Sequence, residues 1–188
     1  MKIEKLSGKK CYLTHLSGEY IPLFIRWMSD PEVTMGLNST HQNIDRRAEL
    51  DFMEFIKQNN WHYFVIVERE TDNPIGAVML FDVNQTNRTA EMGINIGEKS
   101  RWGKGFASEA IGLILEYGFG ILNLHNICLK VFQFNKKAAK LYIKLGFKEM
   151  GVLREFRLAN GKYYDFLMMD MLSKEYYERK YTPEAKHE

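Results

Sequence analysis

The stretch SRWGKGFASEAIG, residues 100–112, combines two glycines, a lysine and the start of an amphipathic run. It follows a strand-like segment over 89–98, where alternate residues are apolar, and it leads into a helical pattern over 106–115. Glycine lets the backbone approach a ligand closely, and N–H groups at a helix N-terminus attract anions. The pattern therefore predicts a strand, a glycine turn and a helix that bind a phosphate or pyrophosphate. The alternative, in which glycine only turns the chain, stays open at this point.

Two familiar phosphate-binding motifs do not fit this stretch. A Walker loop has glycine, four spacers and then Gly-Lys-Ser/Thr, but the sixth position counted from Gly97 is Trp102, and Lys104 is followed by Gly105. A Rossmann fingerprint needs glycine or alanine where Ser108 stands. The stretch therefore argues against a P-loop NTPase and against a dinucleotide-binding Rossmann fold.

Length and composition indicate one ordinary globular domain over residues 1–188. The chain is 45% hydrophobic and 27% charged, and a net charge of +2 gives no reason to expect nucleic acid. No segment resembles a targeting signal or a membrane span. Cys11 and Cys128 lie in apolar runs, which favours buried free thiols in a reducing compartment, and the five histidines lack metal-binding spacing. We expect a cytoplasmic protein with no metal and no membrane partner.

The hydrophobic periodicity predicts alternating helices and strands along the whole chain. Leu50, Met53 and Ile56 stand at helical spacing, Asn135 suits a helix N-cap, Gly146 suits a helix end, and Asn160-Gly161 suits a hairpin turn. The expected strands are 9–16, 61–70, 75–83, 89–98, 126–132, 151–159 and 162–172, and the expected helices are 18–30, 43–58, 106–115, 135–147 and 173–180. This order predicts a mixed α/β sheet, with antiparallel hairpins first and right-handed crossovers later.

The glycine stretch resembles the pyrophosphate-binding motif of the GNAT acetyltransferases, Gln/Arg-x-x-Gly-x-Gly/Ala. Gly105 and Ala107 match that motif, and Trp102 stands where glutamine or arginine is usual. This departure is common in the branch that resembles ribosomal-protein N-terminal acetyltransferases. A second family element follows at the expected spacing, with Asn135, Ala138, Tyr142 and Gly146-Phe147 in order.

The resemblance covers about residues 9–171 and implies a GNAT fold. Such a fold has a mostly antiparallel central sheet, one splayed parallel strand pair and flanking helices. It also implies acetyl-CoA as cosubstrate, with its pantetheine arm between the splayed strands, often at a bulge, beside the backbone of Ile94 and Ile96. Asn135 and Ala138 would contact this arm. The cofactor pyrophosphate would lie on the backbone N–H groups of Arg101, Trp102, Gly103, Lys104, Gly105, Phe106 and Ala107.

Two side chains are candidates for the chemistry of acyl transfer. Tyr142 would protonate the departing thiolate, which is general-acid work, and its alternative role is that of a core aromatic. Glu91 matches a glutamate that often serves as the base in relatives, and its alternative role is that of an exposed strand carboxylate. No nucleophilic cysteine is needed, because direct transfer in a ternary complex depends mainly on positioning.

The sequence is most similar to the branch of ribosomal-protein N-terminal (alanine/serine) acetyltransferases and spermidine acetyltransferases. This resemblance implies an N-acetyltransferase that acts on a primary amine. A protein N-terminal amine is the first choice, and a polyamine or another small molecule such as an aminoglycoside or amino sugar is the alternative. A non-catalytic acyl-CoA sensor is the alternative of another class. The segments 28–43 and 83–88 are expected to wall the acceptor side. The family suggests a monomer or homodimer.

Overall fold

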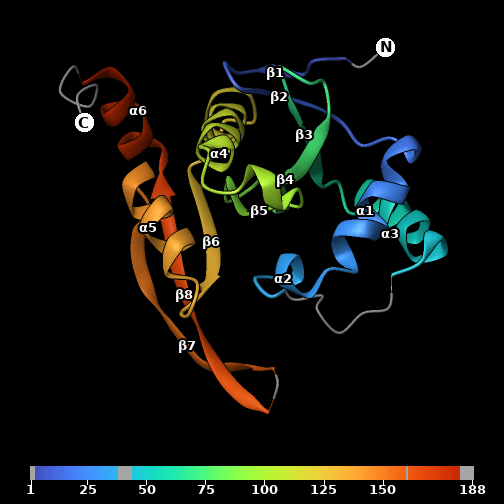
Figure 1. Cartoon of the computed structure of the whole chain (residues 1–188). Coiled ribbons are helices and arrows are strands. Elements are labelled where there is room, and N and C mark those ends of the chain that lie inside the picture. The colour runs from blue at the N-terminus through green and yellow to red at the C-terminus, as the bar shows by residue number, and fades with distance from the viewer. Residues whose placement is uncertain (1–2, 38–43, 160, 183–188) are drawn as a thin grey trace.

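The computed structural model describes residues 3–37, 44–159 and 161–182, and in these ranges eight strands form one sheet (Figure 1). The strand order is β1-β2-β3-β4-β5-β6-β8-β7. Neighbouring strands are antiparallel, except that β5 and β6 are parallel. The strands are β1 (Leu6–Ser7), β2 (Cys11–His15), β3 (His62–Glu68), β4 (Pro74–Asn84), β5 (Thr89–Ile96), β6 (Asn126–Phe132), β7 (Lys148–Ala159) and β8 (Lys162–Leu172). The expected mixed sheet is confirmed.

Helices cover both faces of this sheet because its central strands are apolar on both sides. In β3, Phe64 and Ile66 face one cluster of buried residues, while Tyr63, Val65 and Val67 face the other. One face carries α1 (Ile21–Met28), α2 (Pro31–Thr34) and α3 (Arg46–Gln58). The opposite face carries α4 (Phe106–Glu116), α5 (Lys136–Leu145) and α6 (Ser173–Tyr181).

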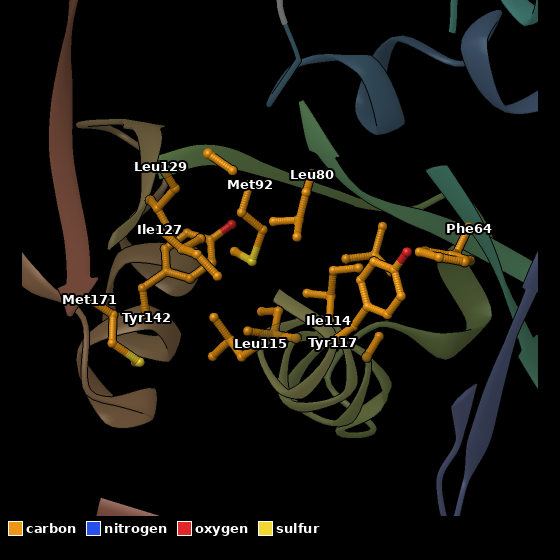
Figure 2. Packing of buried hydrophobic residues seen from close by; sticks show 14 of the residues in the cluster. Phe64, Leu80, Met92, Ile114, Leu115, Tyr117, Ile127, Leu129, Tyr142 and Met171 are labelled. Carbon is orange, nitrogen blue, oxygen red and sulfur yellow. The ribbon is translucent and has the colours of Figure 1, made fainter. Parts of the chain in front are cut away.

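The larger core lies between the sheet and α4. Figure 2 shows Ile114 and Leu115 of α4 reaching toward Leu80, Met92 and Ile127 on the strands. Ile114 and Ile127 are fully buried. Because each buried aliphatic side chain contributes about 1.5–3 kcal/mol, this packing holds α4 firmly against β4 and β5. The N-terminus of α4 is therefore held in place.

Helix ends follow the residues that the sequence marked for them. The Asn135 side chain accepts a hydrogen bond from the Ala138 N–H at 3.2 Å and caps α5, which ends at Gly146 with φ +104°. Asp45 caps α3 in the same way through the Ala48 N–H at 2.8 Å. The predicted cap at Asn135 and the helix end at Gly146 are confirmed.

Several details differ from the expectation. The short strand β1 was not foreseen, β7 begins at Lys148 rather than at 151, and the chain after α4 forms a π-helical turn over Tyr117–Ile121. Leu50 is exposed rather than buried, because α3 turns Glu49 toward the sheet instead. Cys11 is a buried free thiol as expected, whereas Cys128 is only half-buried.

Two expectations involve residues outside the described ranges. Asn160 of the expected turn is one of them, although Ala159 and Lys162 on either side of that turn do pair. Residues 38–43 of the expected acceptor wall are the others. Within 3–37, 44–159 and 161–182, no helix is long and apolar enough to cross a membrane.

Candidate active site

Strands β5 and β6 separate at the centre of the sheet. Their parallel pairing joins Thr89 to Asn126, Ala90 to Ile127 and Glu91 to Cys128, and no further pair between them occurs in the described chain. Beyond this point β6 pairs with β8, and β5 pairs with β4 alone. The side of β5 that faces β6 from Met92 onward therefore has no partner strand. Such backbone can pair with the amides of an extended ligand.

The separation fits the splayed strand pair that the family resemblance implied. Ile94 and Ile96 lie on the separated part of β5, where Val78 and Gly76 of β4 pair with them on the other side. The bulge of this region lies in β4, between Phe81 and Asn84, rather than in the splayed pair itself. The Ile96 carbonyl accepts a hydrogen bond from the Trp102 indole N–H at 2.7 Å.

The glycine loop turns sharply into α4. Gly103 has φ +73° and Gly105, the N-cap of α4, has φ +87°, which is the left-handed region that favours glycine. A side chain at Gly103 would meet no atom within 4 Å, and one at Gly105 would meet only Lys10 Nζ at 3.3 Å. The loop surface is therefore open, and a larger residue here is opposed by backbone conformation rather than by crowding. An open turn of N–H groups at the start of a helix suits a pyrophosphate.

The side chains of this loop have different partners. Arg101 donates to the buried Glu68 carboxylate at 2.8 Å, and this hydrogen bond lowers the pKa of Glu68. Arg101 thus ties the loop to the end of β3, and its backbone N–H is the group expected to contact the pyrophosphate. Phe106 is buried and anchors the first turn of α4, Ala107 is half-buried, and Lys104 is exposed.

Lys10 is a residue of this site that the sequence pattern did not indicate. Its Nζ donates to the Lys104 carbonyl at 2.9 Å, across 94 positions of sequence. The Glu109 carboxylate accepts from the Lys10 backbone N–H at 2.8 Å and so holds the turn before β2 against α4. Two lysine ammonium groups, of Lys10 and Lys104, therefore accompany the glycine loop, which favours an anionic ligand.

Helix α5 carries the second group of predicted residues beside β6. Tyr142 is 8% exposed and packs in the core with Met92 and Leu129 (Figure 2). Burial raises the pKa of Tyr142 to about 12, so its hydroxyl is protonated at neutral pH. That hydroxyl has no hydrogen-bond partner in the part of the chain that the structure describes. The Tyr142 hydroxyl is therefore available to donate a hydrogen bond to a ligand beside the separated strands.

Glu91 lies on the opposite face of the sheet from Tyr142. Alternation along β5 turns Ala90 and Met92 toward α4 and Glu91 away from it. Its carboxylate forms an ion pair with Lys130 Nζ at 2.7 Å, and its side chain is 16% exposed. The structure thus brings Glu91 and Tyr142 to the same separated strand pair, from opposite sides. Whether either acts in catalysis stays a prediction.

The two expected acceptor walls have different positions. The chain after α2 lies beside Asn135, because a side chain at Gly36 would come within 3.4 Å of Asn135 Nδ2. Arg157 of β7 donates to the Leu37 carbonyl. In the 83–88 turn, Arg88 instead donates to the Asn123 carbonyl at 2.6 Å, which ties this turn to the loop before β6.

Comparison with known proteins agrees with this geometry. The family model described as an acetyltransferase (GNAT) domain matches residues 11–148. The chain belongs to the GNAT acetyltransferase family. The expected fold and enzyme class, an N-acetyltransferase of a family that uses acetyl-CoA, are thereby confirmed. The open glycine loop and the separated strands fit that cosubstrate, although no comparison tests the individual site residues.

Two relatives and one solved structure show which N-acetyltransferases the chain is similar to. An N-acetyltransferase of Bacillus licheniformis, p20, is 34% identical over 178 residues, which cover 93% of this chain and 99% of the relative. Spermidine N(1)-acetyltransferase of Vibrio cholerae is 40% identical over 139 residues, covering 74% of this chain and 79% of the relative. The crystal structure of spermidine N-acetyltransferase from Vibrio cholerae in complex with CoA and spermine has a TM-score of 0.82 at 31% identity, over 90% of this chain and 99% of that one. The two Vibrio cholerae matches are spermidine N-acetyltransferases by name, and none of these three relatives is named for a protein N-terminal acceptor.

Proposed function

We propose that this protein transfers the acetyl group of acetyl-CoA to a primary amine of a polyamine. What supports the acceptor is the similarity to spermidine N-acetyltransferases, which extends over 74% of the chain in sequence and 90% in structure. What supports the donor is the glycine loop at the N-terminus of α4, with Lys10 and Lys104 beside it.

In this proposal the thioester lies where β5 and β6 part. The amine nitrogen attacks the thioester carbonyl carbon, so that a C–N bond forms, the C–S bond breaks and the nitrogen gives up one proton. Tyr142 donates to the departing sulfur, which has a thiol pKa of about 8.5 and is a tolerable leaving group. Since the Tyr142 pKa is about 12, its hydrogen bond stabilises the thiolate without loss of the phenol proton at rest.

Glu91 takes the amine proton in this scheme, directly or through water. Its ion pair with Lys130 fixes the carboxylate at the last paired position of β5, next to the parting of the strands. Positioning supplies most of the acceleration, because a thioester and an amine held in contact react as one molecule. Asn135 and the backbone of Ile94 and Ile96 hold the pantetheine arm in this proposal.

An acceptor panel tests the proposed function. Release of free thiol from acetyl-CoA is measured with spermidine, spermine, an aminoglycoside and a short peptide with a free N-terminus. We expect the highest kcat/KM with spermidine or spermine. Turnover of the peptide alone would restore the protein N-terminal acceptor, and CoA binding without turnover of any amine would indicate a sensor.

A further inference from the structure

Helix α3 has a carboxylate in the middle of its buried side. The residues on its buried side include Glu49, Phe52 and Ile56, at the i, i+3 and i+7 spacing of one helical face. Glu49 is 7% exposed, whereas the neighbouring Leu50 is 43% exposed. A sequence chosen for packing alone would reverse the two. Departures of this kind are expected where function requires them.

No cation of the described chain is paired with Glu49. Among the described residues, no hydrogen bond or ion pair reaches its carboxylate. Other acidic side chains on this side of the molecule do have partners: Asp30 binds Lys99 at 2.7 Å, and Glu98 binds Arg26 at 2.9 Å. Burial raises the pKa of Glu49, which is the mark of a desolvated carboxyl group. A buried carboxylate without a partner is costly, so a positive ligand would relieve that cost.

The surroundings of Glu49 suit an ammonium group. Tyr63 lies close enough that the charge of Glu49 adds to the rise in the Tyr63 pKa, which burial dominates. The Tyr63 ring centroid is 5.8 Å from that of Phe52 and 6.2 Å from that of Phe24. Aromatic faces attract organic cations, most strongly in a desolvated site. On the same face the buried Trp27 indole N–H has no partner among the described residues.

A line of paired residues runs from Tyr63, which feels the charge of Glu49, to the separated strands. Tyr63 of β3 pairs with Met79 of β4, and Met79 pairs with Gly93 of β5, two residues past the end of the β5–β6 pairing. Adjacent strands lie about 4.8 Å apart, so Gly93 is about 10 Å from Tyr63. The span of about 10 Å from Tyr63 to Gly93 is longer than a short diamine, and it suits a longer polyamine whose far ammonium group lies on the Tyr63 side, where Glu49 is.

We propose that Glu49 binds a remote ammonium group of the acceptor while the reacting amine lies at the separated strands. The inference rests on the proposed function and specifies it: the site selects linear amines with a second positive charge about two strand spacings from the first. Glu49 is then a specificity-determining residue, which contacts the substrate far from the reacting atoms.

Steady-state kinetics of Glu49→Gln test this inference. Spermidine carries a remote charge, and hexylamine is a monoamine without one. We expect kcat/KM for spermidine to fall roughly 10- to 100-fold, mainly through KM, as for loss of a hydrogen bond to a charged group. The value for hexylamine should stay within about twofold. The control is Asp51→Asn, which removes an exposed carboxylate of the same helix that is paired with Arg47.

An equal loss with both amines, or no loss with spermidine, would overturn the inference. The wild-type rates report on the proposed function separately. If the wild type turned over neither amine, the proposed function would fail, and titration calorimetry of spermidine into CoA-loaded protein would decide about Glu49. Binding that weakens in Glu49→Gln supports the assignment. Equal binding in both proteins, or no binding to the wild type, overturns it.

Discussion

The two faces of the sheet each bury one glutamate, and the two side chains have different surroundings. Glu68, on the α4 side, receives a hydrogen bond from Arg101 at 2.8 Å and one from Thr71 at 2.6 Å, and these bonds lower its pKa. Glu49, on the α1–α3 side, has no such partner among the described residues, and burial raises its pKa. The first carboxylate anchors the glycine loop. By our inference, the second carboxylate binds an ammonium group of the acceptor.

We propose that the two faces of the sheet bind different substrates, the acetyl donor on the α4 side and the amine acceptor on the α1–α3 side. In our proposal the α4 side presents the glycine loop to acetyl-CoA, and the core beneath α4 is apolar and closely packed. In the described chain, buried polar atoms without a partner are not confined to one side: they are the Trp27 indole N–H on the α1–α3 side, Arg101 Nε at the glycine loop and Asn126 Oδ1 on β6. Glu49 differs from these because it is an acidic side chain with no cation paired to it among the described residues.

Tyr142→Phe should give the largest effect, on the α4 side of the comparison. Loss of the hydroxyl is expected to lower kcat about 10²-fold, at the low end of general-acid effects. The phenyl ring keeps the contacts that bury Tyr142, so the Kd for CoA and the melting temperature should hardly change. Single-turnover kinetics measure the rate of acetyl transfer in the variant and the wild type. If Tyr142→Phe turned over at the wild-type rate while the chemical step was rate-limiting, Tyr142 would be only a core aromatic.

Glu91→Gln should have a smaller and pH-dependent effect, on the opposite face. At neutral pH kcat/KM is expected to fall about tenfold, below the usual range for a general base, because Lys130 already neutralises Glu91. The defect should shrink at alkaline pH, where free amine becomes plentiful. A pH–rate profile from neutral to alkaline pH checks this. A deficit of the same size at every pH would assign Glu91 to substrate orientation instead.

Trp102→Phe should change donor binding by a few-fold. The substitution removes the hydrogen bond from the indole to the Ile96 carbonyl at 2.7 Å, which tethers the glycine loop to β5. A net hydrogen bond contributes about 1 kcal/mol, so the Kd for CoA should rise roughly fivefold. Fluorescence or calorimetric titration measures it. Tighter binding would mean that the indole competes with CoA for that carbonyl.

Glu49→Gln should have the smallest effect, on stability. Because folding raises the Glu49 pKa, the native state binds more protons than the unfolded state between the two pKa values. Its ionisation therefore costs stability above the folded pKa, and this cost disappears as pH falls below the unfolded pKa. The variant should melt slightly higher than the wild type at neutral pH and equally at acidic pH. A lower melting temperature at neutral pH would contradict an unpartnered carboxylate.

Much of the fold could be predicted from local pattern. The αL glycines, the Asn135 cap and the period-two strands each follow from residues within a few positions of one another, as does the turn into α4. Lys10 could not be predicted in this way, because its contact with Lys104 spans 94 positions and depends on how β2 docks against α4. Glu49 was missed for another reason: periodicity favoured Leu50, and only the rotation of α3 decides which of the two faces the sheet.

Titration of CoA into Gly105→Val and Glu49→Gln tests the division between the two faces most directly. Valine at φ +87° is strained by about 1–3 kcal/mol and displaces the N–H groups of the loop. The account predicts that Gly105→Val weakens CoA binding at least about tenfold and that Glu49→Gln binds CoA as the wild type does. Wild-type affinity in a folded Gly105→Val protein, or weakened CoA binding in Glu49→Gln, would contradict it.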